Sequence, residues 1–84
     1  MPDVRSPIKH HLVLHKIDAE QGIRRFYSLM IERDLFGTVR LVCHWGRIGT
    51  PGQEMVTEFP TAEEAGEALG TLAQAKRRQG YCDL

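Results

Sequence analysis

The chain has 84 residues with 11 basic and 11 acidic side chains, so its formal net charge is zero. A chain this short holds one hydrophobic core, which excludes a nucleotide-binding fold joined to a catalytic apparatus. Because the charge is balanced, nucleic-acid binding requires a local basic patch or a stacking surface rather than a general attraction for polyanions.

The first residues predict a flexible arm followed by a strand. Residues 1–7 contain two prolines among polar neighbours and resist regular structure. Residues 8–17 read as a strand whose centre, at 12–14, is apolar on both faces. We therefore expect a flexible arm at 1–7 and a single domain at 8–84, whose first strand is buried on both sides.

Three more strands follow, separated by turns that contain glycine. Alternation of side chains places Tyr27 and Leu29 on one face of the second strand. Cys43 and Trp45 share one face of the third strand for the same reason. The expected elements are a turn at 18–22, a strand at 24–33, a hairpin turn at 34–37, a strand at 38–45, a glycine-rich loop at 46–52 and a strand at 53–59.

A capped helix is predicted at residues 62–79. Thr61 is a favourable N-cap, and Glu64 three residues later completes a capping box. Gly66 and Gly70 weaken this helix, and we interpret them as points of close approach to the sheet. The sequence therefore predicts an α+β fold: a four-stranded, mostly antiparallel sheet with one C-terminal helix packed on one face.

The stretch HWGRIGTPG at 44–52 carries the most chemical information. Its glycines recur at every third position and permit positive φ and close backbone approach. The indole of Trp45 offers a flat stacking surface, and the guanidinium of Arg47 offers forked donors that suit phosphate. Together they predict a cradle for a sugar, a base or a phosphate. The loop lacks the Gly-Lys-Ser/Thr ending of a P-loop, so the sequence does not support nucleotide hydrolysis.

These residues make the sequence similar to the WGR domain. The resemblance rests on four segments in the same order and spacing. They are RRFYSLMI at 24–31, WGRIGTPGQ at 45–53, TAEEA at 61–65 and KRRQGY at 76–81. The resemblance spans residues 12–82, nearly the whole chain, and is far more specific than a bare Trp-Gly-Arg triplet.

The resemblance implies a role at DNA. Poly(ADP-ribose) polymerases carry WGR domains beside a catalytic domain, where they help to detect DNA strand breaks. There the motif tryptophan packs on the nucleotide at a broken end, and the motif arginine contacts DNA or a neighbouring domain. By resemblance, Trp45 is the stacking residue and Arg47 the polar contact. Family members often carry an asparagine before the Phe-Tyr pair, where this sequence has Arg24 and Arg25.

The residues and the resemblance together predict a small, non-enzymatic module of the stand-alone bacterial type. We expect it to bind DNA or RNA at ends or breaks through the Trp-Gly-Arg turn, with further basic residues supplying electrostatic attraction. The expected nucleic-acid-binding residues are Trp45, Gly46, Arg47, Arg24, Arg25, Lys76 and Arg77. No catalytic residue, metal or cofactor is predicted.

Each of these residues also has a simpler structural interpretation. A lone tryptophan in a small domain is usually a packing residue, and Trp45 is open to that interpretation. Arg47 is alternatively an ion-pair partner of Glu54. The pair at 24–25 is alternatively a set of edge-strand charges that discourage aggregation. The cations at 76–78 are alternatively complements of the helix dipole.

A protein-interaction or regulatory module is the alternative function. One helix covers only one face of the sheet, which leaves the other face free. An uncovered face that is partly apolar is typical of an interaction surface. This alternative predicts a protein partner or a homodimer that uses the uncovered face.

Histidines and cysteines point to neither a metal site nor a disulfide framework. His10, His11 and His15 invite a metal site, but His11 and His15 lie about 13 Å apart if they are on one strand. Cys43 and Cys82 form no Cys-x-x-Cys pair, which favours a reducing, cytoplasmic setting. No apolar run approaches the ~20 residues that span a bilayer, so we expect no membrane contact.

Overall fold

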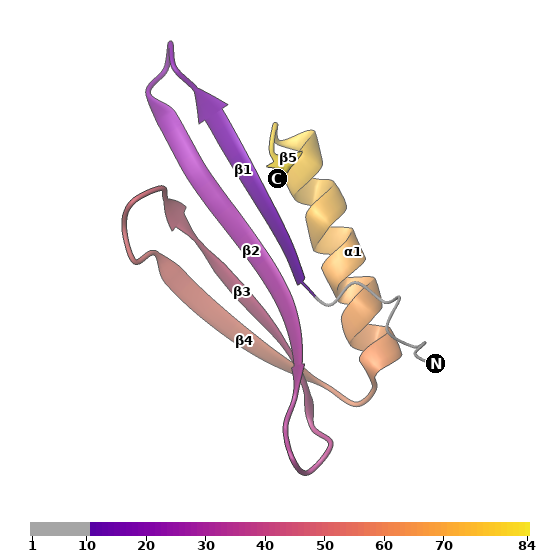
Figure 1. Cartoon of the computed structure of the whole chain (residues 1–84). Helices are drawn as coiled ribbons and strands as arrows, with labels where there is room; N and C mark the ends of the chain where they lie inside the picture. Colours follow the sequence, from indigo (N-terminus) through magenta and orange to yellow (C-terminus); the bar gives the residue numbers. More distant parts are fainter. Residues whose placement is uncertain (1–10) are drawn as a thin grey trace.

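This computed structural model describes residues 11–84. In this part of the chain, five antiparallel strands form one sheet, and a single helix lies across one of its faces (Figure 1). The strand order is β4-β3-β2-β1-β5, so β4 and β5 lie at the two edges. The elements are β1 His11–Asp18, β2 Ile23–Arg33, β3 Val39–Arg47, β4 Gln53–Phe59, α1 Ala62–Arg78 and β5 Cys82–Asp83.

The α+β class and the helix on one face are confirmed, with two differences in the sheet. Every strand pairing is antiparallel. A fifth strand, β5, follows the helix and pairs with β1 through Leu14↔Asp83 and His15↔Cys82. A two-residue strand is too short for a periodic pattern, so periodicity could not predict it. The predicted arm at 1–7, the predicted strand start at residue 8 and His10 lie outside the described residues.

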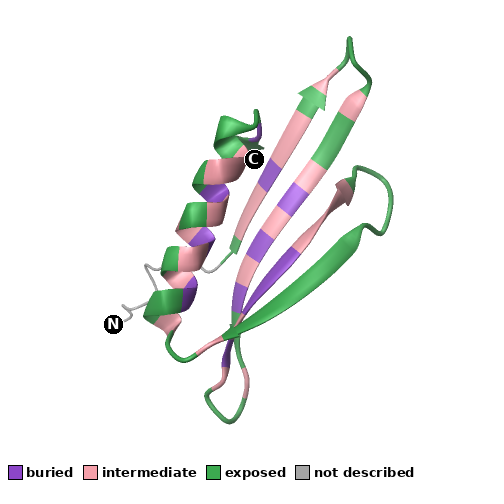
Figure 2. Ribbon diagram, turned by 180° about the vertical axis from the view of Figure 1, so that it is seen from behind, coloured by how far each residue is buried: buried purple, intermediate pink, exposed green. Residues whose placement is uncertain are grey.

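Apolar side chains of alternate residues fill the space between the sheet and the helix. We call the face under α1 the helix side and the other face the open side. The core includes Leu14 and Leu29, both 0% exposed, and three helix residues (Figure 2). Fully burying one leucine stabilises the fold by about 1.5–3 kcal/mol. The helix residues of the core are Ala65, Leu69 and Ala73, and its remaining members are Tyr27, Ile31, Val39, Leu41, Cys43 and Tyr81.

The helix begins at the predicted residue, Ala62, and ends at Arg78, one residue before the predicted end. The side chain of Thr61 accepts a hydrogen bond from the backbone N–H of Glu64 at 3.1 Å, so the N-cap is confirmed. Among residues 11–84, the return bond from the Glu64 side chain to the Thr61 backbone does not form, so only half of the capping box is present. After the helix, Tyr81 is buried in the core and anchors the chain before β5.

Gly66 and Gly70 do not approach the sheet, so that prediction is wrong. A Cβ atom built on either glycine meets no atom of residues 11–84 within 4 Å. The buried helix residues are Ala65, Leu69 and Ala73, each next to or near a glycine in the chain. One residue along a helix rotates the side chain by 100°, which turns the glycines away from the sheet. The small residues that allow close packing here are the two alanines.

Candidate nucleic-acid interface

Hydrogen bonds order the loop that joins β3 to β4. The Ile48 N–H donates to the Arg24 carbonyl at 2.9 Å and extends the pairing of β2 with β3. The Thr50 N–H and hydroxyl both donate to the Arg47 carbonyl, at 3.0 and 2.8 Å. His44 donates through Nε2 to the Pro51 carbonyl at 2.6 Å. The Trp-Gly-Arg turn therefore has a defined shape.

Two glycines let this turn close on itself. A Cβ on Gly46 would lie 2.7 Å from the Cα of Gly52, which is far inside contact distance. Gly52 has φ +76°, and a Cβ there would overlap the Trp45 carbonyl oxygen and lie 2.9 Å from the Phe26 ring. Both positions therefore require glycine for steric reasons, and at Gly52 the left-handed backbone adds a second reason.

Trp45 stands on the helix side as one half of an aromatic stack. Its ring is stacked on Tyr27, with centroids 5.8 Å apart and an interplanar angle of 18°. The side chain is partly buried against the core, so it is neither a sealed core residue nor a fully exposed one. Tyr27 is on β2 and covers one face of the indole. The other face is therefore directed toward the edge strand β4, where Gln53 is the exposed cross-strand neighbour.

The support beneath the stack is rigid and buried. Tyr27 is 7% exposed, and Tyr81 packs edge-on against it at 6.2 Å between centroids. Lys76 holds its ammonium 4.5 Å from the centroid of the Tyr27 ring. Burial, and to a lesser extent the nearby Cys43, raises the pKa of Tyr27 to about 12, so its phenol is neutral at physiological pH. This setting leaves Tyr27 as a fixed platform for Trp45.

Three cationic side chains form a row beside the aromatic stack. Lys16 is the cross-strand partner of Arg25, and Arg25 is the cross-strand partner of Arg47. Each of these three residues lies two positions along its own strand from a side chain of the core or of the aromatic stack. Side chains two positions apart share a face of the sheet, so all three cations lie on the helix side. We call Lys16, Arg25 and Arg47 the basic row. Neighbouring strands lie about 4.7–4.9 Å apart, which brings like charges close together.

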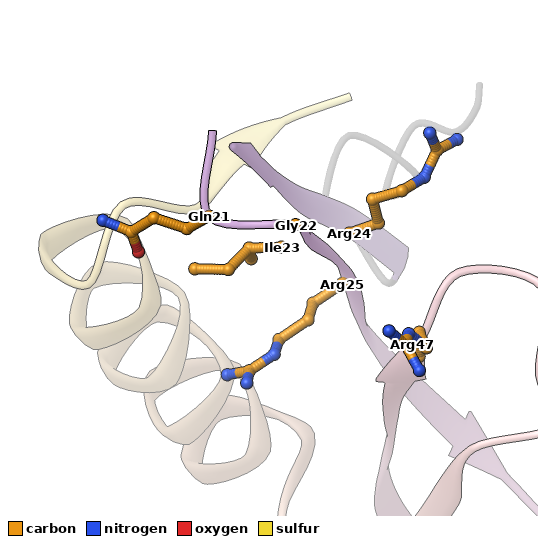
Figure 3. A pocket seen from close by; sticks show the side chains of 6 residues that line it. All are labelled: Gln21, Gly22, Ile23, Arg24, Arg25 and Arg47. Atoms are coloured by element: carbon orange, nitrogen blue, oxygen red, sulfur yellow. The ribbon is translucent and has the colours of Figure 1, made fainter. Parts of the chain in front are cut away.

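A shallow hollow of about 320 Å³ opens at this end of the sheet (Figure 3). Three of its lining residues are arginines. Figure 3 shows Arg24 and Arg25 leaving β2 in opposite directions, with Arg47 on the neighbouring strand. Arg24 therefore reaches the hollow from the open side, as its position in the strand requires. The other lining residues are Gln21, Gly22 and Ile23.

The cations of the basic row form no ion pair within residues 11–84. Asp18 lies two residues from Lys16 on the same face of β1, and its carboxylate accepts hydrogen bonds from the backbone of the turn that follows β1. The alternative ion pair between Arg47 and Glu54 does not form, because the two residues alternate onto opposite faces of the sheet. The loop at 48–52 contains no acidic residue. Arg25 and Arg47 are exposed and therefore present positive charge to solvent.

The two predicted binding residues at the end of the helix have other contacts. Arg77 forms a two-pronged ion pair with Asp83, with N···O distances of 2.7 and 2.8 Å. This contact holds the pKa of the Asp83 carboxyl below its usual range. Lys76 lies over Tyr27 and Tyr81 and also reaches Gln79 at 3.4 Å. Arg77 therefore has its charge compensated, and Lys76 is part of the aromatic support.

Sequence reasoning missed two members of this surface, Lys16 and Tyr27. Lys16 stands opposite Arg25 because the turn after β1 sets the register Asp18↔Ile23. Counting back from the predicted turn would have identified this pair. The predicted alternation places Tyr27 on the same face as Leu29, and both are buried in the core. The second role of Tyr27, as the platform for Trp45, depends on a cross-strand pairing that the alternation alone does not specify.

Two further expectations concern metals and membranes. In the described part of the chain, no three His, Cys, Asp or Glu side chains gather in a way that could hold a metal ion. His11 and His15 both lie on β1, four residues apart. Over the same residues, no helix is long and apolar enough to cross a membrane.

An antiparallel sheet with one C-terminal helix and an ordered Trp-Gly-Arg turn defines a class of small domain. A family model described as the WGR domain matches residues 10–84. The chain therefore belongs to the WGR domain family.

Two related proteins share this domain but are longer. The uncharacterized protein y4dW of Sinorhizobium fredii is 39% identical over 72 residues, which cover 86% of this chain and 35% of the relative. The crystal structure of a Bacteroides fragilis protein matches with a TM-score of 0.73 and 27% identity, over 88% of this chain and 19% of that protein. The chain thus spans about a third of the first relative and a fifth of the second.

Proposed function

We propose that this chain is a non-catalytic module that binds nucleic acid and recognises DNA ends. Trp45 packs its outer ring face on the terminal nucleotide. Arg47 and Arg25 contact the phosphates beside that nucleotide. The single observation that carries the proposal is the stack of the partly exposed Trp45 on Tyr27, next to Arg25 and Arg47, which form no ion pair within residues 11–84.

The number of open ring faces favours an end over a continuous strand. Proteins that track single strands use successive aromatic side chains, each stacking on one base. Here Tyr27 has Trp45 on one side and the Lys76 ammonium over its ring. Only the β4-facing side of Trp45 is left for a ligand. One stacking position suits a terminal base or sugar, because inside a duplex the bases already stack on each other.

Electrostatics favour an anionic ligand at the same place. Like charges directly opposite each other on adjacent strands destabilise a sheet. A phosphate between the guanidinium groups of Arg25 and Arg47 relieves this repulsion and accepts charge-assisted hydrogen bonds. Lys16 extends the row toward the end of the helix. A neutral protein can therefore bind a polyanion through one local patch.

The remaining predicted residues take supporting roles in this proposal. Gly46 allows the turn to close, and Lys76 acts through Tyr27 rather than on the ligand. Arg24 reaches the hollow from the open side, where it contacts a phosphate further along the backbone. We leave Arg77 out of the interface because Asp83 compensates its charge.

The protein-interaction alternative has weaker support on the open side. Val56 and Ile17 are about half exposed there, but Val42 between the strands is already buried. Charged and polar residues such as Glu54 and His44 separate the apolar ones. A cytoplasmic location fits the proposed nucleic-acid partner, and the free thiols of the chain suit a reducing compartment.

Replacing Arg25 or Arg47 with glutamine is expected to weaken binding to a blunt DNA duplex by roughly tenfold, because each change removes a charge-assisted phosphate contact. The slope of log K against log salt is expected to fall by about one for each variant. Fluorescence anisotropy at several salt concentrations measures both quantities. The probes are labelled duplexes with blunt, nicked and recessed ends, single-stranded DNA and the matching RNA.

Arg33→Gln is the matched control for this experiment. Arg33 is exposed and lies on the same strand and face as Arg25, eight residues away. This variant is expected to bind like the unchanged protein. Equal losses for Arg25→Gln and Arg33→Gln would mean that binding is diffuse attraction, and the basic row would not be a site. Binding to none of the probes would leave the protein-interaction alternative.

A further inference from the structure

The turn between β2 and β3 exposes two large apolar side chains. Leu35 is 98% exposed and Phe36 is 91% exposed. The turn lies at the opposite end of the sheet from the Trp-Gly-Arg turn, since β2 runs from one end to the other (Figure 1). We call Leu35 and Phe36 the apolar tip. Neighbouring large apolar side chains that are almost fully exposed are typical of interaction sites.

The apolar tip is held in place by Asp34. Its Oδ1 accepts hydrogen bonds from the backbone N–H groups of Phe36 and Thr38, at 2.8 and 2.9 Å. Backbone bonds from Asp34 to Thr38 and from Gly37 to Asp34, both 3.1 Å, close the turn. The hydrogen bond from the Thr38 N–H contributes most to lowering the pKa of the Asp34 carboxyl, and the bond from the Phe36 N–H lowers it further. The two side chains are therefore presented on an ordered backbone, which reduces the entropy lost on binding.

The charges around the apolar tip indicate what kind of partner it fits. Arg40 contacts Asp34 at 3.4 Å and Glu32 at 4.0 Å. Glu58 is the cross-strand partner of Arg40, so with Arg33 these five charges sum to minus one, two positive and three negative. Binding to a nucleic acid or to an anionic lipid surface needs an excess of cations, and the charges around the apolar tip provide none. A rim of mixed charge around exposed apolar side chains matches a protein surface.

We propose that Leu35 and Phe36 anchor the chain in an apolar pocket on a partner protein. An aromatic side chain that fills a pocket within a polar rim is the common form of an interface hot spot. The anchor does not depend on DNA binding. Arg25 lies eight residues before the end of β2 at Arg33, so about 26 Å of strand separates the basic row from the turn that carries the apolar tip. Both ends can be occupied at once, and the chain then joins its partner protein to DNA.

The test compares three forms of the full chain as baits in a lysate of the source cells. They are the unchanged chain, the Leu35→Ser/Phe36→Ser variant and the control Leu84→Ser, which removes a side chain that is 83% exposed elsewhere. A protein retained by the first and third forms but not by the second is identified, purified and titrated against all three. We expect a 1:1 complex that the double variant weakens by about tenfold or more and the control leaves unchanged.

Further measurements decide between the anchor and other uses of the same residues. Thermal unfolding of the double variant is expected to match that of the unchanged chain, because the replaced side chains are not packed. Its DNA binding is also expected to be unchanged. The proposal is overturned if no purified protein shows binding that depends on the apolar tip. It is equally overturned if the tip-dependent event is self-association in sedimentation equilibrium or binding to phosphatidylcholine–phosphatidylserine vesicles.

Discussion

Replacing Trp45 with alanine is expected to weaken binding to a blunt DNA duplex by roughly five- to 150-fold. Stacking of a base on an aromatic side chain contributes about 1–3 kcal/mol, which converts to that range of dissociation constants. The slope of affinity against salt is expected to stay the same, because the variant keeps Arg25 and Arg47. Fluorescence anisotropy with the labelled blunt duplex measures the loss and the slope in one series.

Two further measurements separate lost stacking from lost folding. Trp45 packs on Tyr27, so the alanine variant also loses part of the core contact. Trp45→Phe keeps an aromatic ring on the platform and is expected to recover most of the affinity. Thermal unfolding of each variant shows whether it is folded at the temperature of the titration. A folded Trp45→Ala variant that binds the blunt duplex as tightly as the unchanged chain would remove the indole from the interface.

Alanine at Gly52 is expected to cause the largest loss of stability of any single change in the turn. The added Cβ collides with the Trp45 carbonyl and the Phe26 ring, and φ +76° is a left-handed conformation. Overpacking costs about 1–3 kcal/mol and the left-handed backbone about 1–2 kcal/mol more. For a domain of this size, 1 kcal/mol shifts the melting temperature by about 4–8 °C. We expect the melting temperature to fall by 10 °C or more, as measured by circular dichroism.

Gly46→Ala tests the same contact from its other side. Its Cβ would be 2.7 Å from the Cα of Gly52, and backbone on both sides leaves little room to adjust. We expect a loss of about 1–3 kcal/mol from overpacking alone. Gly66→Ala is the control, since its Cβ meets nothing, and it is expected to raise stability by up to about 1 kcal/mol. If Gly46→Ala unfolds at the same temperature as the control Gly66→Ala, the result would contradict the close approach of Gly46 to Gly52 in the turn.

The sequence predicted the elements whose patterns repeat over many residues. Alternation over 24–33 and 38–45 identified β2 and β3, and the N-cap at Thr61 located the helix start. The same alternation correctly placed Cys43 and Trp45 on one face. These predictions succeed because burial of one face constrains every second or every third to fourth residue.

Features that depend on one or two residues, or on contacts distant in sequence, were not predictable in this way. The strand Cys82–Asp83 is too short for a period, and the Arg77–Asp83 ion pair exists only because that strand returns past the helix. The direction in which Gly66 points depends on which stripe of helix residues faces the sheet. The four-residue spacing of the two glycines does not specify that stripe. Membership of Lys16 in the basic row follows from hairpin register rather than from any motif.

Fluorescence of Trp45, the only tryptophan in the chain, tests the central claim most directly. The chain is titrated with a blunt-ended duplex and with a dumbbell of the same sequence whose ends are closed by loops. If the indole packs on a terminal nucleotide, the blunt duplex quenches its emission to saturation while the dumbbell, at equal base-pair concentration, leaves it nearly unchanged. Equal quenching by both DNAs, or binding of the blunt duplex with no change in emission, would contradict recognition of ends through Trp45.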